Sequence, residues 1–123
     1  MDLDIDAAVK FLAENAKPAP TFHCAAYVRK ALEAGGLDMT DRPISAKDYG
    51  PYLLRLGFTS MAQEMYLPQA GDVVVIQNYN GGDVHGHIAM YDGPQWVSDF
   101  KQQDMWGGPG YRTKKPSYMV YRP

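Results

Sequence analysis

One cysteine and three histidines make up the smallest set of side chains that can supply a thiol nucleophile and a general base. Cys24 opens the segment from Cys24 to Ala34, whose apolar residues have helical periodicity, so the thiol falls in the first turn of an expected helix. Free backbone N–H groups and the helix dipole favour negative charge there, and we expect them to lower the thiol pKa and to bind an oxyanion. A free cysteine is often only a small buried hydrophobe. The first-turn position is what favours catalysis.

The base must come from another part of the chain. His23 is adjacent to Cys24, and on a helix the two side chains would point about a quarter-turn apart. His85 lies in an expected loop, where a surface or hydrogen-bonded role is the simpler interpretation. His87 begins a short apolar run and can project from the end of a strand toward the helix tip, so we predict that His87 is the base.

A third polar group usually orients the base, and two neighbouring residues compete for this role. If the hairpin loop after the His87 strand has an odd number of residues, Asp99 lies opposite Ala89 and one diagonal step from His87. A two-residue loop reverses the parity and places Ser98 there instead. We predict Asp99, with Ser98 as the alternative.

Two tryptophans near these residues have two interpretations. Trp96 and Trp106, with Ser98, are candidates for binding substrate at the rim of a cleft, together with Tyr111 and the glycines at 107, 108 and 110. Equally, Trp96 can belong to the core, and Trp106 can anchor a loop.

The expected elements change from helices to strands along the chain. Helices are predicted at 4–16 and 24–34, with Thr21 as the cap of the second, and a helical segment at 45–57 that Gly50-Pro51 splits. Strands are predicted at 73–76, 87–91, 95–100 and 118–121, with a loop at 106–110. This order predicts a single α+β domain over residues 1–123, with N-terminal helices packed on an antiparallel sheet.

Composition excludes several classes of function. The net charge is −2, without a block of Lys or Arg, so a strong electrostatic interaction with nucleic acid or a membrane surface is not expected. The first six residues are acidic and lack the apolar run of a Sec signal, and no stretch is long and apolar enough to span a bilayer. A single cysteine allows no internal disulfide, and we expect no cofactor.

Three segments in order resemble the signature of NlpC/CHAP cysteine peptidases, which have a papain-like fold. They are Cys24 at the start of a helix, Pro68 with Gly71-Asp72 before a strand, and Gly86-His87 at the start of the next strand. The resemblance implies Cys24 as nucleophile, His87 as base and Asp99 as the orienting residue.

A closer resemblance, at residues 24–36, 45–50, 71–77 and 96–106, is to the second family of type VI secretion amidase effectors. It implies cleavage of peptidoglycan stem peptides at the D-alanine–meso-diaminopimelate cross-link, in the periplasm of a rival cell reached without a Sec signal. It also implies a cognate immunity protein, and we expect the enzyme itself to be a monomer.

Three other interpretations remain open from the residues alone. His85, His87, Asp83 and Cys24 could bind zinc, although they lack the usual paired spacing of zinc sites. The chain could be a binding module without catalysis. A thiol acyltransferase or transpeptidase would share the first half-reaction, in which the thioester forms.

Overall fold

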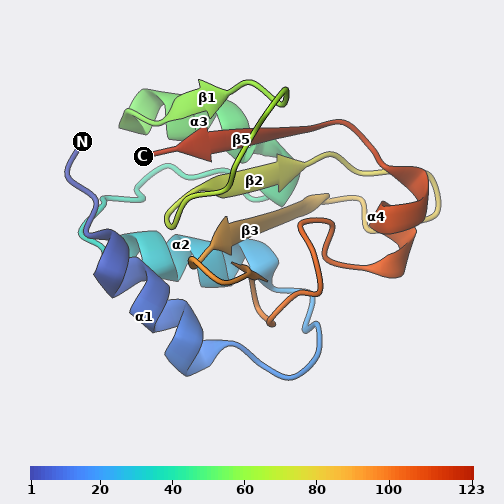
Figure 1. Ribbon diagram of the computed structural model, residues 1–123, viewed down its shortest axis with the longest axis horizontal. Helices are drawn as coiled ribbons and strands as arrows, with labels where there is room; N and C mark the ends of the chain where they lie inside the picture. Colours follow the sequence, from blue (N-terminus) through green and yellow to red (C-terminus); the bar gives the residue numbers. More distant parts are fainter.

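The computed structural model describes residues 1–123 and has the α+β architecture predicted from the sequence (Figure 1). In chain order the elements are α1 (Ile5–Asn15), α2 (Cys24–Ala34), a 3₁₀ turn η1 (Ala46–Asp48), α3 (Tyr49–Leu56), β1 (Thr59–Met61), β2 (Val73–Ile76), β3 (His87–Tyr91), β4 (Trp96–Val97), α4 (Pro109–Lys114) and β5 (Tyr118–Arg122). The five strands form one sheet in the order β1-β5-β2-β3-β4, with every neighbouring pair antiparallel.

The two N-terminal helices start in different ways. Asp4 caps α1 by accepting a 3.0 Å hydrogen bond from a first-turn N–H. The expected cap Thr21 does not cap α2; His23 occupies that position and makes no side-chain cap hydrogen bond. The N–H groups of the first turn of α2 are therefore left without a capping side chain. None of the helices is both long and apolar enough to cross a lipid bilayer.

The helical segment expected at 45–57 is divided, but not at Gly50-Pro51. The 3₁₀ turn η1 ends at Asp48 and α3 begins at Tyr49, so Pro51 falls in the first turn of α3. The backbone N–H that proline lacks has no partner within a helix at this position, so the helix accommodates the residue. Gly57, with a φ of 108°, ends the helix.

The strand expected at 95–100 is much shorter. β4 pairs with β3 only through Met90–Val97 and Tyr91–Trp96, and the chain then turns back on itself. The backbone N–H of Gln102 donates to the carbonyl of Trp96 at 2.9 Å, which closes this turn. The segment expected as strand therefore forms a compact loop beside the start of β3.

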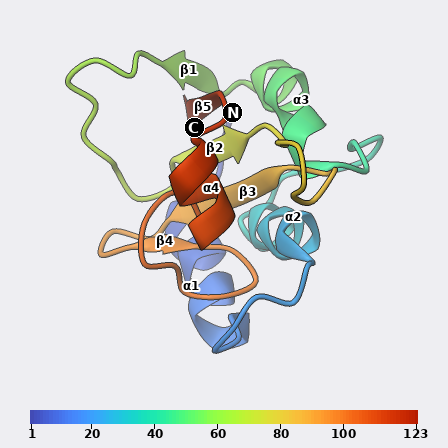
Figure 2. The ribbon, with the colours of Figure 1, turned by 90° about the vertical axis from the view of Figure 1, so that its right-hand side faces the viewer.

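Both faces of the sheet are buried, one by helices and the other mainly by aromatic side chains. One face carries Val73, Val75, Ile88 and Met90 and packs against the helices of the first half of the chain. Figure 2 shows α2 and α3 on this side. The opposite face is covered mainly by aromatic side chains from loops, strands and α4, which are Tyr66, Tyr91, Trp96, Trp106, Tyr111 and Tyr118.

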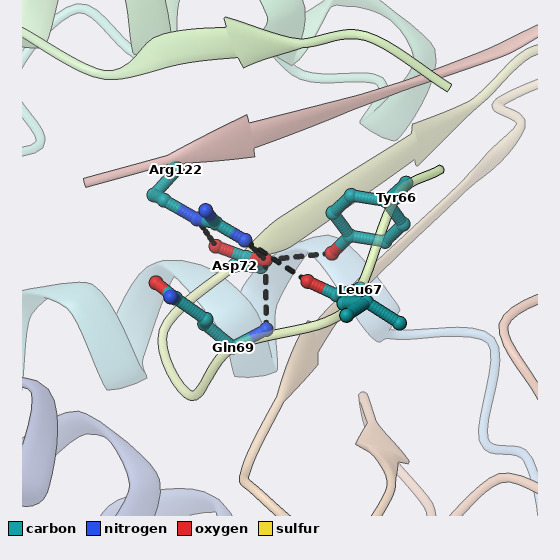
Figure 3. A network of polar contacts seen from close by, with 5 residues as sticks. All are labelled: Tyr66, Leu67, Gln69, Asp72 and Arg122. Carbon is teal, nitrogen blue, oxygen red and sulfur yellow. Dashed lines mark hydrogen bonds and ion pairs between the residues drawn. The ribbon is translucent and has the colours of Figure 1, made fainter. Parts of the chain in front are cut away.

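An ion pair between a buried carboxylate and a partly exposed arginine fixes the long connection between β1 and β2 (Figure 3). Asp72 is fully buried, and its carboxylate accepts two hydrogen bonds of 2.9 Å from Arg122 on β5. It also accepts from the Tyr66 hydroxyl at 2.6 Å and from the backbone N–H of Gln69 at 3.0 Å. Arg122 donates in addition to the carbonyl of Leu67 at 3.1 Å, so one carboxylate and one guanidinium tie the connection to the end of the chain.

Candidate active site

Cys24 and His87 line one pocket of about 310 Å³. Cys24 reaches the pocket from the first residue of α2, and His87 reaches it from the first residue of β3. The pocket is completed by a loop that includes Gly107 and by Tyr111 of α4. The structure thus brings together two residues that are 63 positions apart in the chain (87 − 24).

The segment before α2 is held by Asp99. One oxygen of this carboxylate accepts hydrogen bonds from the backbone N–H and the hydroxyl of Thr21, the latter at 2.8 Å, and lies 3.5 Å from the backbone N–H of His23. Between them, Phe22 has a φ of 65°, which is uncommon for a side chain of this size, and it is 84% exposed. The Asp99 carboxylate therefore fixes the tight turn from which Cys24 is presented.

His87 is oriented by a glutamine. The Oε1 atom of Gln102 lies 2.7 Å from Nε2 of His87, and the amide NH₂ of Gln102 donates to the carbonyls of Asp104 and Met105 at 2.9 and 3.3 Å. These two carbonyls fix which end of the amide faces the histidine. Because an amide oxygen only accepts, Nε2 of His87 must carry the proton, and Nδ1 is left with a lone pair for the general base.

Burial keeps the pair neutral. It raises the pKa of the Cys24 thiol to about 11, and the charge of Asp99 adds to the shift, while the N–H groups of Ile88 and Ala25 oppose it. Burial lowers the pKa of His87, although Gln102 and Asp99 oppose that shift. The expectation of a lowered thiol pKa was wrong, because desolvation outweighs the helix N-terminus. At neutral pH the resting pair is thiol and imidazole.

Asp99 and Ser98 do not contact the His87 ring through a hydrogen bond. Continuing the β3–β4 register by one residue would place Ser98 opposite Ala89, which is the even-loop case, but β4 ends before it. The fully buried Ser98 hydroxyl donates to Asp99 at 3.0 Å. Asp99 therefore acts on the pair by its charge and through Thr21, and Gln102 occupies the position expected for an orienting residue.

The sequence interpretation did not include Gln102. It lies beyond the expected strand in a polar stretch, and only the turn after Val97 brings its side chain to the histidine. No local pattern indicates that turn, so no signal in the sequence distinguishes Gln102 from the exposed Gln103 beside it.

The tryptophans predicted to bind substrate do not line this pocket. Trp96 is 7% exposed and packs edge-to-face on Tyr91, with ring centroids 5.1 Å apart. Trp106 packs edge-to-face on Tyr118, with centroids 5.4 Å apart. The structure places Trp96 in the core and Trp106 as a loop anchor, which was the other interpretation of these residues.

Tyr111 does line the pocket and has an unusual hydroxyl. Its ring lies 5.7 Å from the His87 ring and packs edge-to-face on Tyr79 at 4.9 Å, measured between centroids. Its hydroxyl is buried without a hydrogen-bond partner. Burial raises its pKa strongly, so the phenol stays protonated.

Two of the residues considered as zinc ligands, Asp83 and His85, make hydrogen bonds within the protein. His85 Nδ1 lies 2.6 Å from the hydroxyl of Ser45. Asp83 accepts a hydrogen bond of 2.8 Å from the backbone N–H of His85. No group of three or more His, Cys, Asp or Glu side chains converges on a common point.

Comparison with known proteins identifies the family. No protein-family model and no curated protein sequence matches the chain. Two solved structures of the type VI effector–immunity complex Tae3–Tai3 from Ralstonia pickettii do match. The native form has 47% identity and a TM-score of 0.87 over 96% of this chain and 97% of the other. The selenomethionine form has 47% identity and a TM-score of 0.85 over 94% and 99%.

This degree of identity over nearly the full length of both chains shows that the protein belongs to the Tae3 family of type VI secretion effectors. The resemblance drawn from the sequence is confirmed as far as type VI effectors are concerned. The solved relatives are named Tae3, so the assignment to the second family of such effectors is replaced by this one.

Proposed function

We propose that the protein is a cysteine-dependent peptidoglycan amidase of NlpC/CHAP type that acts as an interbacterial effector. One observation carries the proposal: Cys24 and His87 share a pocket, and Gln102 holds the histidine in the tautomer that leaves Nδ1 free to take a proton. Membership of the Tae3 effector family supports a target in a rival cell.

In the proposed reaction, Nδ1 of His87 removes the thiol proton as the Cys24 sulfur attacks an amide carbonyl. The N–H groups at the start of α2 lie next to the sulfur, have no capping side chain, and suit the oxyanion of the tetrahedral intermediate. His87 then gives its proton to the leaving amine, and a thioester remains on Cys24.

The second half-reaction is hydrolysis of the thioester. His87, neutral again, takes a proton from a water molecule, whose oxygen attacks the thioester carbonyl and releases the carboxylic acid and the free thiol. The Asp99 carboxylate favours the positively charged imidazolium in both steps, and its charge opposes the burial effect on the pKa of His87.

The proposed substrate is the stem peptide of peptidoglycan, cut at the D-alanine–meso-diaminopimelate cross-link in the periplasm of the target cell. The solved relatives are complexes with the immunity protein Tai3. We therefore also propose a cognate immunity protein for this chain, which protects the producing cell.

The experiment is digestion of purified meso-diaminopimelate peptidoglycan by the wild type, Cys24→Ala and His87→Ala, with products separated by liquid chromatography and identified by mass spectrometry. We expect cross-linked dimers to become monomers with the wild type alone, while circular dichroism shows that both variants are folded. Shortened stem peptides would still indicate an amidase, but one that cuts a bond within the stem and not the cross-link. New cross-links would indicate acyl transfer. Cleavage by Cys24→Ala equal to that by the wild type would refute the nucleophile, whereas material left uncut by both would favour a binding module.

A further inference from the structure

Phe22 combines two properties that do not favour a stable fold. Its φ of 65° lies in the left-handed region, which glycine, asparagine and aspartate adopt more easily than an aromatic residue does. Its side chain is 84% exposed, so the ring adds little to the core. The hydrogen bonds that Asp99 accepts from the backbone on either side would hold the same turn with asparagine at position 22. The stability of this turn therefore gives no reason for an aromatic ring here.

Phe22 lies at the junction of two pockets that both contain the nucleophile. The first is the pocket of about 310 Å³ that Cys24 shares with His87. The second, of about 250 Å³, extends along the start of α2, where Ala25 and Ala26 line it. Phe22 and Cys24 line both pockets. A peptide with its scissile carbonyl at the Cys24 sulfur extends into one pocket on each side, and Phe22 lies beside it in both.

The wall that the two pockets share favours an apolar group of the substrate. Besides Cys24, the residues that line both pockets are Phe22, Asp83 and Gly86, and of these only Phe22 has an apolar side chain. In the proposed cross-link, the D-alanine that supplies the scissile carbonyl carries a methyl group. The diaminopimelate on the other side carries a carboxylate next to the amide nitrogen. An aromatic ring removes the methyl group from water, whereas the negative face of the ring repels the carboxylate.

We infer that the ring of Phe22 is a substrate-binding surface that packs against the D-alanine methyl group and so places the scissile carbonyl at Cys24. The inference rests on the proposed function. It does not depend on which pocket receives the D-alanine, because Phe22 lines both. Phe22 is then a specificity residue for D-alanine, and the chemistry of bond cleavage stays with Cys24 and His87.

The test compares two cross-linked stem-peptide dimers, one with D-alanine and one with glycine at the scissile bond. Values of kcat and KM are measured for the wild type, for Phe22→Asn, which removes the ring but suits the left-handed backbone, and for Phe22→Tyr, which keeps the ring. Met65→Asn is the matched control, because Met65 is also apolar and exposed, has a φ of 55°, and lines neither pocket. Alkylation by iodoacetamide separately reports how Cys24, the only cysteine, is presented.

We expect the wild type, Phe22→Tyr and Met65→Asn to cleave the D-alanine dimer with a kcat/KM about fourfold higher than that for the glycine dimer, as burial of one methyl group predicts. Phe22→Asn should cleave the two dimers equally well. Its kcat/KM for the D-alanine dimer should be about tenfold below that of the wild type, mainly through a higher KM, because the ring contacts the substrate before and during the reaction. Its rate of alkylation should equal that of the wild type.

An unchanged preference for D-alanine in Phe22→Asn, or equal cleavage of both dimers by the wild type, would overturn the inference. Slower alkylation of Phe22→Asn would also overturn it, because the ring would then act through the presentation of Cys24 and not through the substrate. In each of these cases cleavage by the wild type leaves the proposed function standing. Failure of the wild type to cleave either dimer would overturn the proposed function and the inference together.

Discussion

The thiol and the imidazole of the candidate site differ from a preformed thiolate–imidazolium pair. Burial raises the pKa of Cys24 and lowers that of His87, so both shifts favour the neutral forms. Proton transfer from sulfur to nitrogen then has to accompany the attack on the substrate.

The pH dependence follows from these directions. The active form needs a neutral His87, so kcat/KM should fall in acid through an apparent pKa below the ordinary histidine value of 6.5. It should then stay level into the alkaline range, because the thiol pKa is about 11. Steady-state rates across that range check this. A decline at about pH 8–9, near the pKa of an ordinary thiol, would contradict the neutral pair.

The pH dependence of activity tests whether Gln102 positions His87. In Gln102→Glu, a carboxylate can still accept from Nε2, but its charge favours the imidazolium, so the acid limb should move to higher pH by about one unit. Gln102→Ala should lower kcat by about 10–100-fold, because the ring loses its orienting partner. Gln103→Glu, at the exposed neighbour, is the control. If the acid limb of the Gln102→Glu profile lay at the same pH as that of the wild type, Gln102 would not be a positioning residue for His87.

The Tyr111 hydroxyl should lower the free energy of unfolding. An unpaired buried hydroxyl is destabilising, so Tyr111→Phe should raise the free energy of unfolding by about 1 kcal/mol, measured by urea denaturation. Tyr66→Phe is the converse control, because its hydroxyl donates to Asp72 and its loss should lower stability. A destabilised Tyr111→Phe would mean that the hydroxyl has a partner.

At the scale of elements, the loop before α4 determines how closely the chain can pack over the histidine. A Cβ on Gly107 would meet Nε2 of His87, the atom that faces Gln102, and the φ of Gly107 is 79°. Only glycine fits both requirements.

Gly107→Ala should therefore separate His87 from Gln102 and lower kcat at least tenfold. Gly93→Ala is the control for backbone strain, because Gly93 has a φ of 114° and its Cβ would meet nothing. Both variants should lose about 1 kcal/mol of stability, and Gly107→Ala alone should lose most of its activity. Full activity in Gly107→Ala, measured on the same substrate, would show that the loop moves freely.

The elements that the sequence predicts well are those with local causes. Helices α1 and α2 have apolar periodicity and clear stops, and β2 and β3 are short apolar runs between turns. The ends of β4, the helix α4 and the contact between Gln102 and His87 depend on how the chain turns after Val97. Such a turn is fixed by tertiary hydrogen bonds, and for that reason the sequence predicts the starts of α2 and β3, where Cys24 and His87 lie, but not the contact that Gln102 makes.

At the scale of the whole molecule, the Asp72–Arg122 pair joins the last strand to the β1–β2 connection. Arg122→Gln would leave a fully buried carboxylate with only the Tyr66 and Gln69 hydrogen bonds. We expect a loss of about 2–3 kcal/mol in the free energy of unfolding, since an unpaired buried charge is costly. Urea denaturation, with Lys30→Gln as the control for lost charge, checks this; equal stability of the two variants would contradict it.

The two ends of the chain lie side by side in both ribbon views, and the start of α2 and of β3 lies at the other end of the strands (Figures 1 and 2). Ile5 and Pro123 both approach Gly71, which agrees with that placement. A tether, label or carrier attached at either terminus would therefore be joined to the protein on the side opposite the pocket of Cys24 and His87. A molecule immobilised on a bead or a sensor in this way would present that pocket outward to an insoluble substrate.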